Sequence, residues 1–178
     1  MSVVPEAAPG TQPVSLARPG TLTAAIGLAV LTALAAIANA VIILAGGLDL
    51  VKEVGNEIVA AELGVSEAEL EEALDFVGPA VDQLYAEAQS TFQTRAYLIL
   101  ACGAALLVFG LLMRKAATAH RVLVTVAAAL TIVFAAVIAT DAGTSAMIGL
   151  GWAAVVGSLV TIVLTWLPAN GKYAKAAK

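Results

Sequence analysis

Side chains that carry charge or redox chemistry are scarce in this 178-residue chain. It has a single cysteine, Cys102, and a single histidine, His120, and charged residues make up only 12% of it, against about 25% in an ordinary soluble domain. One cysteine can form neither an internal disulfide nor a dithiol couple, and one histidine cannot supply a bis-histidine haem or a metalloprotease zinc site. The net charge of -4 disfavours contact with phosphate backbones. We therefore expect no catalytic residue, no metal, no cofactor and no nucleic-acid partner.

Hydrophobic residues, by contrast, make up 61% of the chain, and the mean hydropathy is +0.95. A soluble domain of this size exposes too much surface to water to carry so many apolar side chains. This composition excludes a soluble protein, and it predicts that much of the surface faces a lipid bilayer.

The membrane spans follow from the gaps between charged residues. Four charge-free gaps, between residues 18 and 49, 95 and 114, 121 and 141, and 141 and 172, hold 30, 18, 19 and 30 residues. A helix needs about 20 mostly apolar residues to cross the hydrocarbon core. We therefore predict an all-α fold, a four-transmembrane-helix bundle whose helices occupy 21–47, 96–113, 121–140 and 144–167.

The basic residues orient this bundle. Seven of the nine lie in or beside three segments, namely the tail 1–20, the turn 114–120 and the tail 168–178, whereas twelve of the thirteen acids fall in 48–95 and at Asp141. Because lysine and arginine concentrate on the cytoplasmic side, both termini are expected in the cytoplasm. Segment 48–95 and the short turn 141–143 are then extracytoplasmic, and the tail 1–20 is expected to be disordered because it contains four prolines and no apolar period.

A cleavable signal peptide is the competing interpretation of the first span. Ala38-Asn39-Ala40 has the small residues of a cleavage site, but the apolar run continues through Val41 to Leu44 and exceeds a normal signal core. We expect the span to stay uncleaved.

Segment 48–95 is acidic and has helical periodicity, with three predicted helices. The first ends at Gly64, and Ser66 with Glu69 forms a capping box that starts the second, 67–77. Pro79 begins the third. The limbs 48–63 and 79–95 have matching lengths, so we expect them to pair antiparallel beneath the short helix as an extracytoplasmic helical cap. Its carboxylates are expected to form a solvated helix face.

Few polar residues lie within the spans. A candidate intramembrane polar site consists of Asn39, Thr161 and Thr165, since polar groups in a bilayer are expensive and often functional. Small residues recur every fourth position at Gly149, Ala153 and Gly157, and this candidate helix-packing stripe continues to the same threonines. Its expected partner is either a second subunit or the first span, through the small residues Ala29, Ala33 and Ala36.

The layout resembles a group of small four-span membrane proteins of high-GC Gram-positive bacteria. The resemblance rests on the proline-containing tail, the entry Arg18-Pro19-Gly20-Thr21, the basic turn before Val122, and Leu167-Pro168 followed by Lys172-Tyr173. It implies a bacterial plasma membrane and transfers no catalytic residue.

Packing motifs without a catalytic constellation predict a non-enzymatic membrane protein that acts through helix association. Its expected partners are the lipid bilayer and either itself, as an oligomer, or a larger membrane complex, as an accessory subunit. Two alternatives remain open. One is a small oligomeric channel or transporter with Asn39 and the threonines along the pathway, and the other is an envelope sensor that uses the cap.

Overall fold

The computed structural model describes residues 17–115 and 117–176, and within them the chain is all-helical with no strand. The predicted all-α class is confirmed, whereas most of the predicted tail 1–20 lies outside the described residues. The elements are α1 (Gly20–Leu63), α2 (Glu67–Val77), α3 (Pro79–Leu112), the 3-10 turn η1 (Met113–Lys115), α4 (Thr118–Thr140), α5 (Ser145–Thr165) and α6 (Pro168–Ala176).

In the described ranges, four helices are long and apolar enough to cross a membrane, namely α1, α3, α4 and α5. They identify the chain as a multi-pass membrane protein. α1 and α3 run well past the charge-free gaps, because each also includes part of the acidic segment; α3 does so without interruption, and α1 does so across a bend at Gly47. Residues 168–176, expected only as a basic tail, form the additional helix α6.

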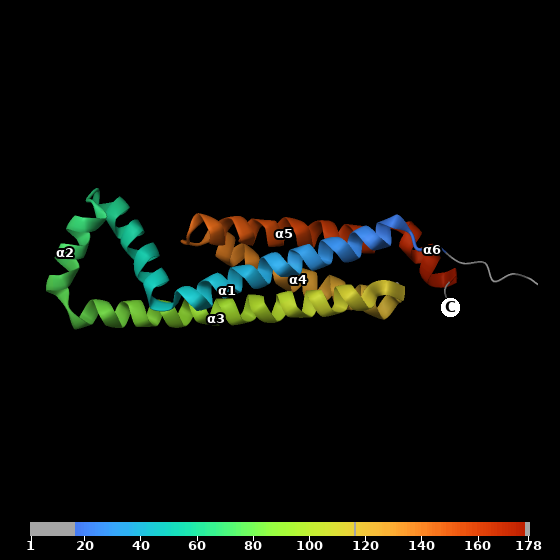
Figure 1. Ribbon diagram of the computed structural model, residues 1–178, viewed down its shortest axis with the longest axis horizontal. Coiled ribbons are helices and arrows are strands. Elements are labelled where there is room, and N and C mark those ends of the chain that lie inside the picture. The colour runs from blue at the N-terminus through green and yellow to red at the C-terminus, as the bar shows by residue number, and fades with distance from the viewer. Residues whose placement is uncertain (1–16, 116, 177–178) are drawn as a thin grey trace, which may run out of the picture.

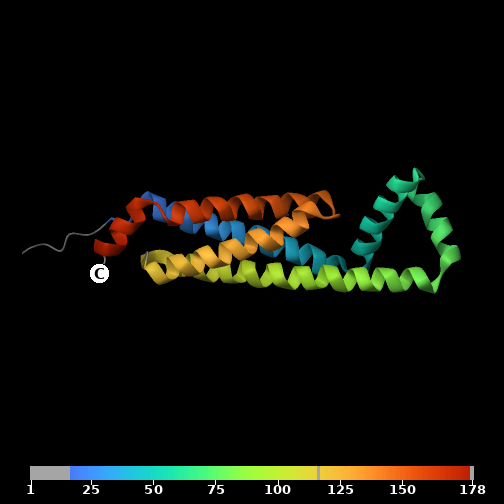
Figure 2. The same cartoon turned by 180° about the vertical axis from the view of Figure 1, so that it is seen from behind.

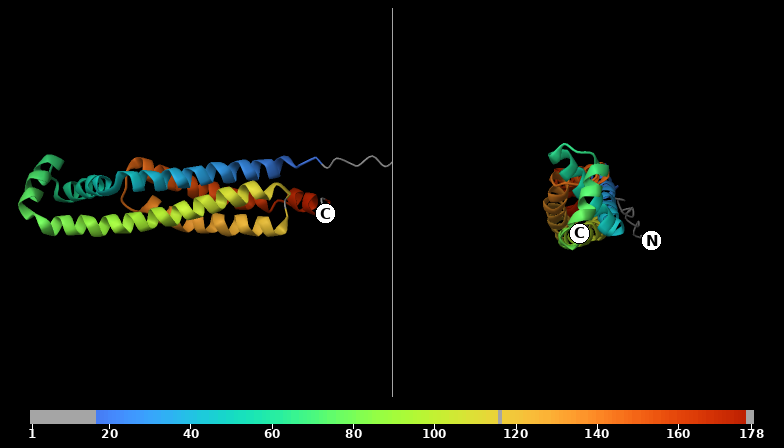
Figure 3. Two further views of the ribbon diagram at one scale, coloured as in Figure 1. Left: turned by 60° about the horizontal axis from the view of Figure 1, so that its bottom comes forward. Right: turned by 90° about the vertical axis from the view of Figure 1, so that its left-hand side faces the viewer.

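The four long helices lie side by side in an elongated assembly (Figures 1 and 2). α1 packs against α3 and α5, and α4 packs against α5 and α3. The α4–α5 turn and α2 lie toward one end, whereas the start of α1, the α3–α4 turn and α6 lie toward the other, as a third direction also shows (Figure 3).

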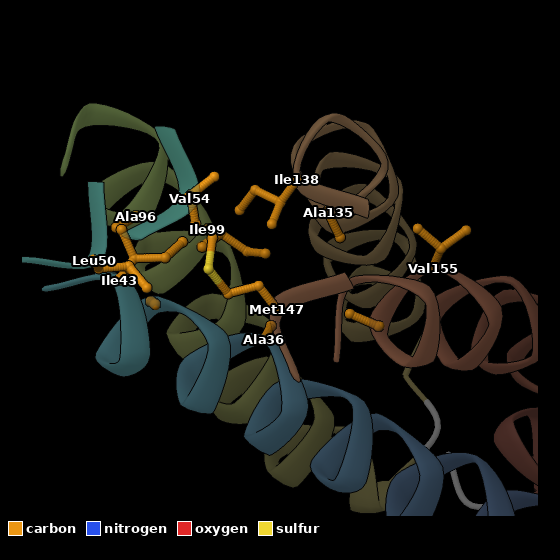
Figure 4. Packing of buried hydrophobic residues seen from close by; sticks show 12 residues of the cluster. Ala36, Ile43, Leu50, Val54, Ala96, Ile99, Ala135, Ile138, Met147 and Val155 are labelled. Carbon is orange, nitrogen blue, oxygen red and sulfur yellow. The ribbon is translucent and has the colours of Figure 1, made fainter. Parts of the chain in front are cut away.

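Two apolar clusters fill the interior. The first, shown in Figure 4, joins all four long helices near the α4–α5 turn and includes Ile43, Ile99, Ile138 and Met147. The second lies nearer the opposite end and includes Leu22, Leu106, Met113 and Val124. Alanines account for many of the remaining buried positions, so the helix backbones lie close together.

Glycine and alanine make the contact between α1 and α3. A Cβ added at Gly103 would lie 3.2 Å from the Cβ of Ala36 and 3.3 Å from the carbonyl oxygen of Ala33, and one added at Gly110 would lie 3.0 Å from the Cβ of Ala29. The small face of α1 therefore packs on α3, whereas α1 meets the stripe of α5 through Thr32 at Gly157.

The predicted stripe on α5 does not occupy one face. Each step of four residues turns an α-helix by about 40° beyond a full circle, so three steps shift the side chain by about 120°. Accordingly Gly149 and Ala153 are exposed, Gly157 packs against the Thr32 side chain of α1, and Thr161 is buried. The α5 glycine that meets α4 is Gly151, where an added Cβ would lie 2.9 Å from the Cβ of Ala139.

Beyond the four-helix part, the distal part of α1, α2 and the start of α3 form a triangle (Figure 1). Its three corners are Gly47, Gly64 and Gly78, the positive-φ glycines of the described residues, with φ of 53°, 67° and 61°. A residue with a Cβ is strained in this conformation. The predicted helix end at Gly64 and the predicted helix start at Pro79 are confirmed. The bend inside α1 at Gly47 was not predicted from the sequence, although the Gly46-Gly47 pair is a turn signal.

The expected antiparallel pairing of the two limbs is present over only part of their length. The α1 limb contacts α3 around Gly55 and Tyr85 and then diverges from it, so that α2 bridges the gap as the third side. The positive φ at Gly47 redirects the limb away from the axis of the preceding helix.

The predicted capping box of α2 is present. The Ser66 amide and hydroxyl donate to a Glu69 carboxylate oxygen at 2.9 and 2.8 Å, and the Glu69 amide donates to the Ser66 hydroxyl at 3.3 Å. These donors, the backbone amide first, lower the pKa of Glu69 below its ordinary value. The cap is therefore complete above the ordinary pKa, and it is lost as pH falls through the lowered one.

The close contact at Gly151 predicts opposite effects of one added methyl group at two positions of α5. Gly151→Ala must push α4 away and should lower the free energy of unfolding by about 1–3 kcal/mol. Gly149→Ala meets no atom within 4 Å and should be neutral or stabilising, because alanine is the better helix former. Reversible unfolding in mixed micelles measures both, and equal effects would contradict the close α4–α5 packing.

Candidate functional site

The polar side chains buried in the four-helix part are the candidates for function. They are Thr32, Asn39, Arg121, Thr131, Ser158, Thr161, Thr165 and Asn170, and each is at most 6% exposed. These residues lie at three levels along the long axis, each with a different chemistry.

Asn39 links α1 to the first turn of α5. Its side-chain amide nitrogen donates to the carbonyl oxygen of Met147 at 3.0 Å, and its own side-chain oxygen is buried without a partner among the described residues. The site lies within the first apolar cluster, beside Ile43 and Met147. A carboxamide does not titrate, so this residue can orient helices or bind a polar group but cannot transfer protons.

The other two predicted intramembrane residues lie far from Asn39. Thr161 and Thr165 follow Met147 by 14 and 18 residues on α5, which corresponds to about 21 and 27 Å along the helix. The Thr165 hydroxyl contacts the Met113 sulfur at 3.8 Å, and the Thr161 hydroxyl oxygen has no partner among the described residues. The three candidates therefore do not form one site.

Thr161 instead belongs to a layer of small polar side chains between the two apolar clusters. Thr32 comes from α1, Cys102 from α3, Thr131 from α4, and Ser158 and Thr161 from α5. The Thr131 hydroxyl donates to the carbonyl of Ala127 at 2.9 Å, whereas the other three hydroxyl oxygens have no partner in the described part of the chain. Buried hydroxyls of this kind are commonly satisfied by an internal water. None of the layer residues carries a charge, so the layer offers no charge relay.

Arg121 organises the end of the assembly near α6. This residue was expected only as one of the orienting charges, yet it is 6% exposed and its Nε donates to the Thr165 carbonyl at 3.0 Å. Its guanidinium lies 4.5 Å from the centre of the Trp166 ring, and the Trp166 indole nitrogen donates to the Thr125 hydroxyl at 2.8 Å. The cation therefore caps the C-terminal end of α5, where the helix dipole favours positive charge.

Asn170 fastens α6 to the same end. Its amide nitrogen donates to the Leu164 carbonyl at 2.7 Å, and its side-chain oxygen accepts a hydrogen bond from the Thr21 hydroxyl of α1 at 2.8 Å. No spacing rule links Thr21 to Asn170 across 149 positions, and only the proline at the start of α6 marks a new element in the sequence.

At the other end, an ion pair joins α3 to the α4–α5 turn. Arg95 donates to the carboxylate of Asp141, and both side chains are partly exposed. The pair is one of two salt bridges among the described side chains, the other being Lys52 with Asp82. Because both side chains are partly exposed, the pair should add only about 0–1 kcal/mol to the free energy of unfolding. Its main effect is to fix the position of the α4–α5 turn against α3.

Within the described ranges there is no group of three or more histidine, cysteine, aspartate or glutamate side chains that could hold a metal ion. Comparisons of the chain with protein-family models, with curated proteins and with solved structures give no match.

The Asn39 hydrogen bond predicts a graded response to substitution. Asn39→Leu removes one interhelical bond and should cost about 1 kcal/mol. Asn39→Asp places a carboxylate against the Met147 carbonyl oxygen and should cost more, about 2.5–3.5 kcal/mol. Unfolding in mixed micelles tests the order, with the exposed Ala38→Leu as control. A wild type no more stable than Asn39→Leu would contradict the role of this bond.

Proposed function

We propose that this chain is a non-enzymatic integral membrane protein of a bacterial plasma membrane that works by association, either with itself or as an accessory subunit of a larger membrane complex. The contact surface is the helical triangle. The observation that carries the proposal is an apolar groove between the two limbs of the triangle, in the one long segment of the chain that is too acidic to lie in lipid.

The proposed topology is a four-transmembrane-helix bundle with both termini in the cytoplasm and residues 48–95 outside. Its support is the segregation of charge along the long axis. Arg114, Arg121, Lys172 and Lys175 belong to the end that carries α6, and the acids of α1 and α2 belong to the triangle end. This distribution follows the rule that basic residues remain on the cytoplasmic side.

The groove has a volume of about 280 Å³ and is walled by apolar side chains from both limbs. Buried Val51 and Val54 line it together with Ala88 and Phe92, and Ile58 and Leu84 also line it while remaining 39% and 66% exposed. Burying 100 Å² of apolar surface stabilises a protein or complex by about 2.5 kcal/mol, and surface left in water does not gain this stabilisation. In the proposed topology neither lipid nor the protein's own core covers Ile58 and Leu84, so an apolar segment of a partner or of a second copy would cover them.

A channel or transporter remains the alternative, with one structural restriction. Asn39, Thr161 and Thr165 are fully buried within a single chain. A pathway lined by them would therefore run through one subunit and not between subunits. The sensor alternative is favoured by a polar pocket on the inner face of the triangle.

The topology predicts which engineered cysteines an impermeant maleimide can reach. In a Cys102→Ala background, Glu72→Cys on α2 should be labelled on intact cells, whereas Lys172→Cys on α6 should be labelled only after the cells are broken open. Both positions are exposed. The reverse pattern would overturn the orientation and leave the helix packing untouched.

Association through the groove predicts a loss of crosslinks when its rim becomes polar. After crosslinking of intact cells and affinity purification, the wild-type chain should be recovered attached to a second copy or to another membrane protein. Leu84→Gln should reduce that product at least tenfold, and the neighbouring exposed Gln83→Ser should leave it unchanged. No crosslinked product, or equal amounts from Leu84→Gln and wild type, would overturn the proposal.

A further inference from the structure

The inner face of the triangle has a second pocket, which differs from the apolar groove because charged and polar side chains line it. It has a volume of about 200 Å³, and side chains from all three helices line it. These residues are Lys52, Asn56, Leu74, Val81, Asp82 and Tyr85, with Gly78 at the corner. Pockets for drug-sized ligands occupy about 300–1,000 Å³, so this one suits a small metabolite.

Opposite charges meet at the wall of this pocket. The Lys52 ammonium lies 3.8 Å from a carboxylate oxygen of Asp82, and the two side chains are 42% and 74% exposed. An exposed pair at this distance is weak, because water competes for both partners. Both groups are thus available to a ligand that offers a better-placed counter-charge to each.

A short hydrogen bond holds the rest of the wall in place. The Tyr85 hydroxyl donates to the side-chain oxygen of Asn56 at 2.5 Å, joining α3 to the α1 limb. Burial, and then the negative charge of Asp82, raises the pKa of Tyr85, so the phenol remains a neutral donor at physiological pH. The Lys52 ammonium lies 5.7 Å from the centre of the Tyr85 ring, within cation–π range.

Two apolar side chains complete the pocket. Leu74 comes from α2 and Val81 from the first turn of α3, so they approach from the side opposite the α1 limb that carries Lys52 and Asn56. The lining therefore combines one cation, one anion, a fixed amide–phenol pair and an apolar patch within a volume of metabolite size.

We propose that this pocket binds a free α-amino acid with an apolar side chain. Lys52 receives the ligand carboxylate, Asp82 receives its ammonium group, and Leu74 and Val81 contact its side chain. The site is independent of the association described above, since it lies on the inner face of the triangle and requires no partner chain.

The paired charges select a zwitterion over singly charged molecules. A carboxylate without an amine would lie beside the unneutralised Asp82, and an amine without a carboxylate would lie beside Lys52. Each loses one attraction and meets one repulsion, which is how a site discriminates between close analogues.

Isothermal titration of the full chain in lipid nanodiscs tests the proposal with matched probes. L-Leucine, L-valine, L-methionine and L-phenylalanine are titrated separately, alongside 4-methylpentanoate, which is leucine without its amine, and 3-methylbutylamine, which is leucine without its carboxylate. We expect saturable binding of at least one amino acid, and affinity for leucine at least tenfold above that for either analogue. Absence of saturable binding by all four amino acids, or equal affinity for leucine and an analogue, would overturn the proposal.

Charge-neutralising variants locate the site. Lys52→Gln and Asp82→Asn should each weaken amino-acid binding at least tenfold, whereas Glu87→Gln, an exposed carboxylate outside the pocket on the same helix as Asp82, should leave it unchanged. All three positions are exposed enough to preserve the fold, which far-ultraviolet circular dichroism checks. Unchanged binding in both pocket variants would refute the assignment. Because the titration needs no partner, failure of the association proposal would not affect its outcome.

Discussion

Close approach of helix backbones is the constraint on which the rest of this structure depends. Within lipid, an apolar side chain gains little by exchanging a lipid neighbour for a protein one, so helices associate through dense van der Waals contact. Glycine and alanine allow that contact at Gly103 and Gly110 on α3 and at Gly151 and Gly157 on α5. A methyl group at Gly151 would already lie 2.9 Å from Ala139, which shows how little separation these pairs have.

That packing determines what the polar residues inside the assembly can do. Asn39 reaches the Met147 carbonyl because α1 and α5 lie close together, and the middle layer of hydroxyls is closed off from the surface for the same reason. The charged contacts lie at the two ends, with Arg121 on the Thr165 carbonyl of α5 and Arg95 with Asp141 at the opposite turn. The buried polar groups of the interior thus connect helices, whereas the charged and polar side chains that line a pocket lie in the triangle.

The triangle is stabilised differently from the four-helix part of the chain. Its helices are acidic and partly solvated, and its shape depends on the backbone conformation of three glycines and not on a dense core. The bend at Gly47 and the two turns at Gly64 and Gly78 give the triangle one polar pocket on its inner face and one apolar groove along its limbs. The proposed amino-acid site and the proposed association surface therefore lie on different faces of the same element.

The sequence by itself determined the local features. Long gaps without charge predict lipid-facing helices. The Ser66–Glu69 pair predicts the start of α2, Gly64 predicts the end of α1, and Pro79 predicts the start of α3. Each of these features depends on residues within one continuous stretch of the chain. Only the tertiary structure decided which helix lies opposite which face. It placed Ala29, Ala33 and Ala36 against α3, separated Asn39 from Thr161 and Thr165, buried Arg121 under Trp166, and brought Lys52 to Asp82. Periodicity records which residues share a side of one helix, but the choice among several equally apolar neighbours depends on backbone contacts between segments far apart in the chain.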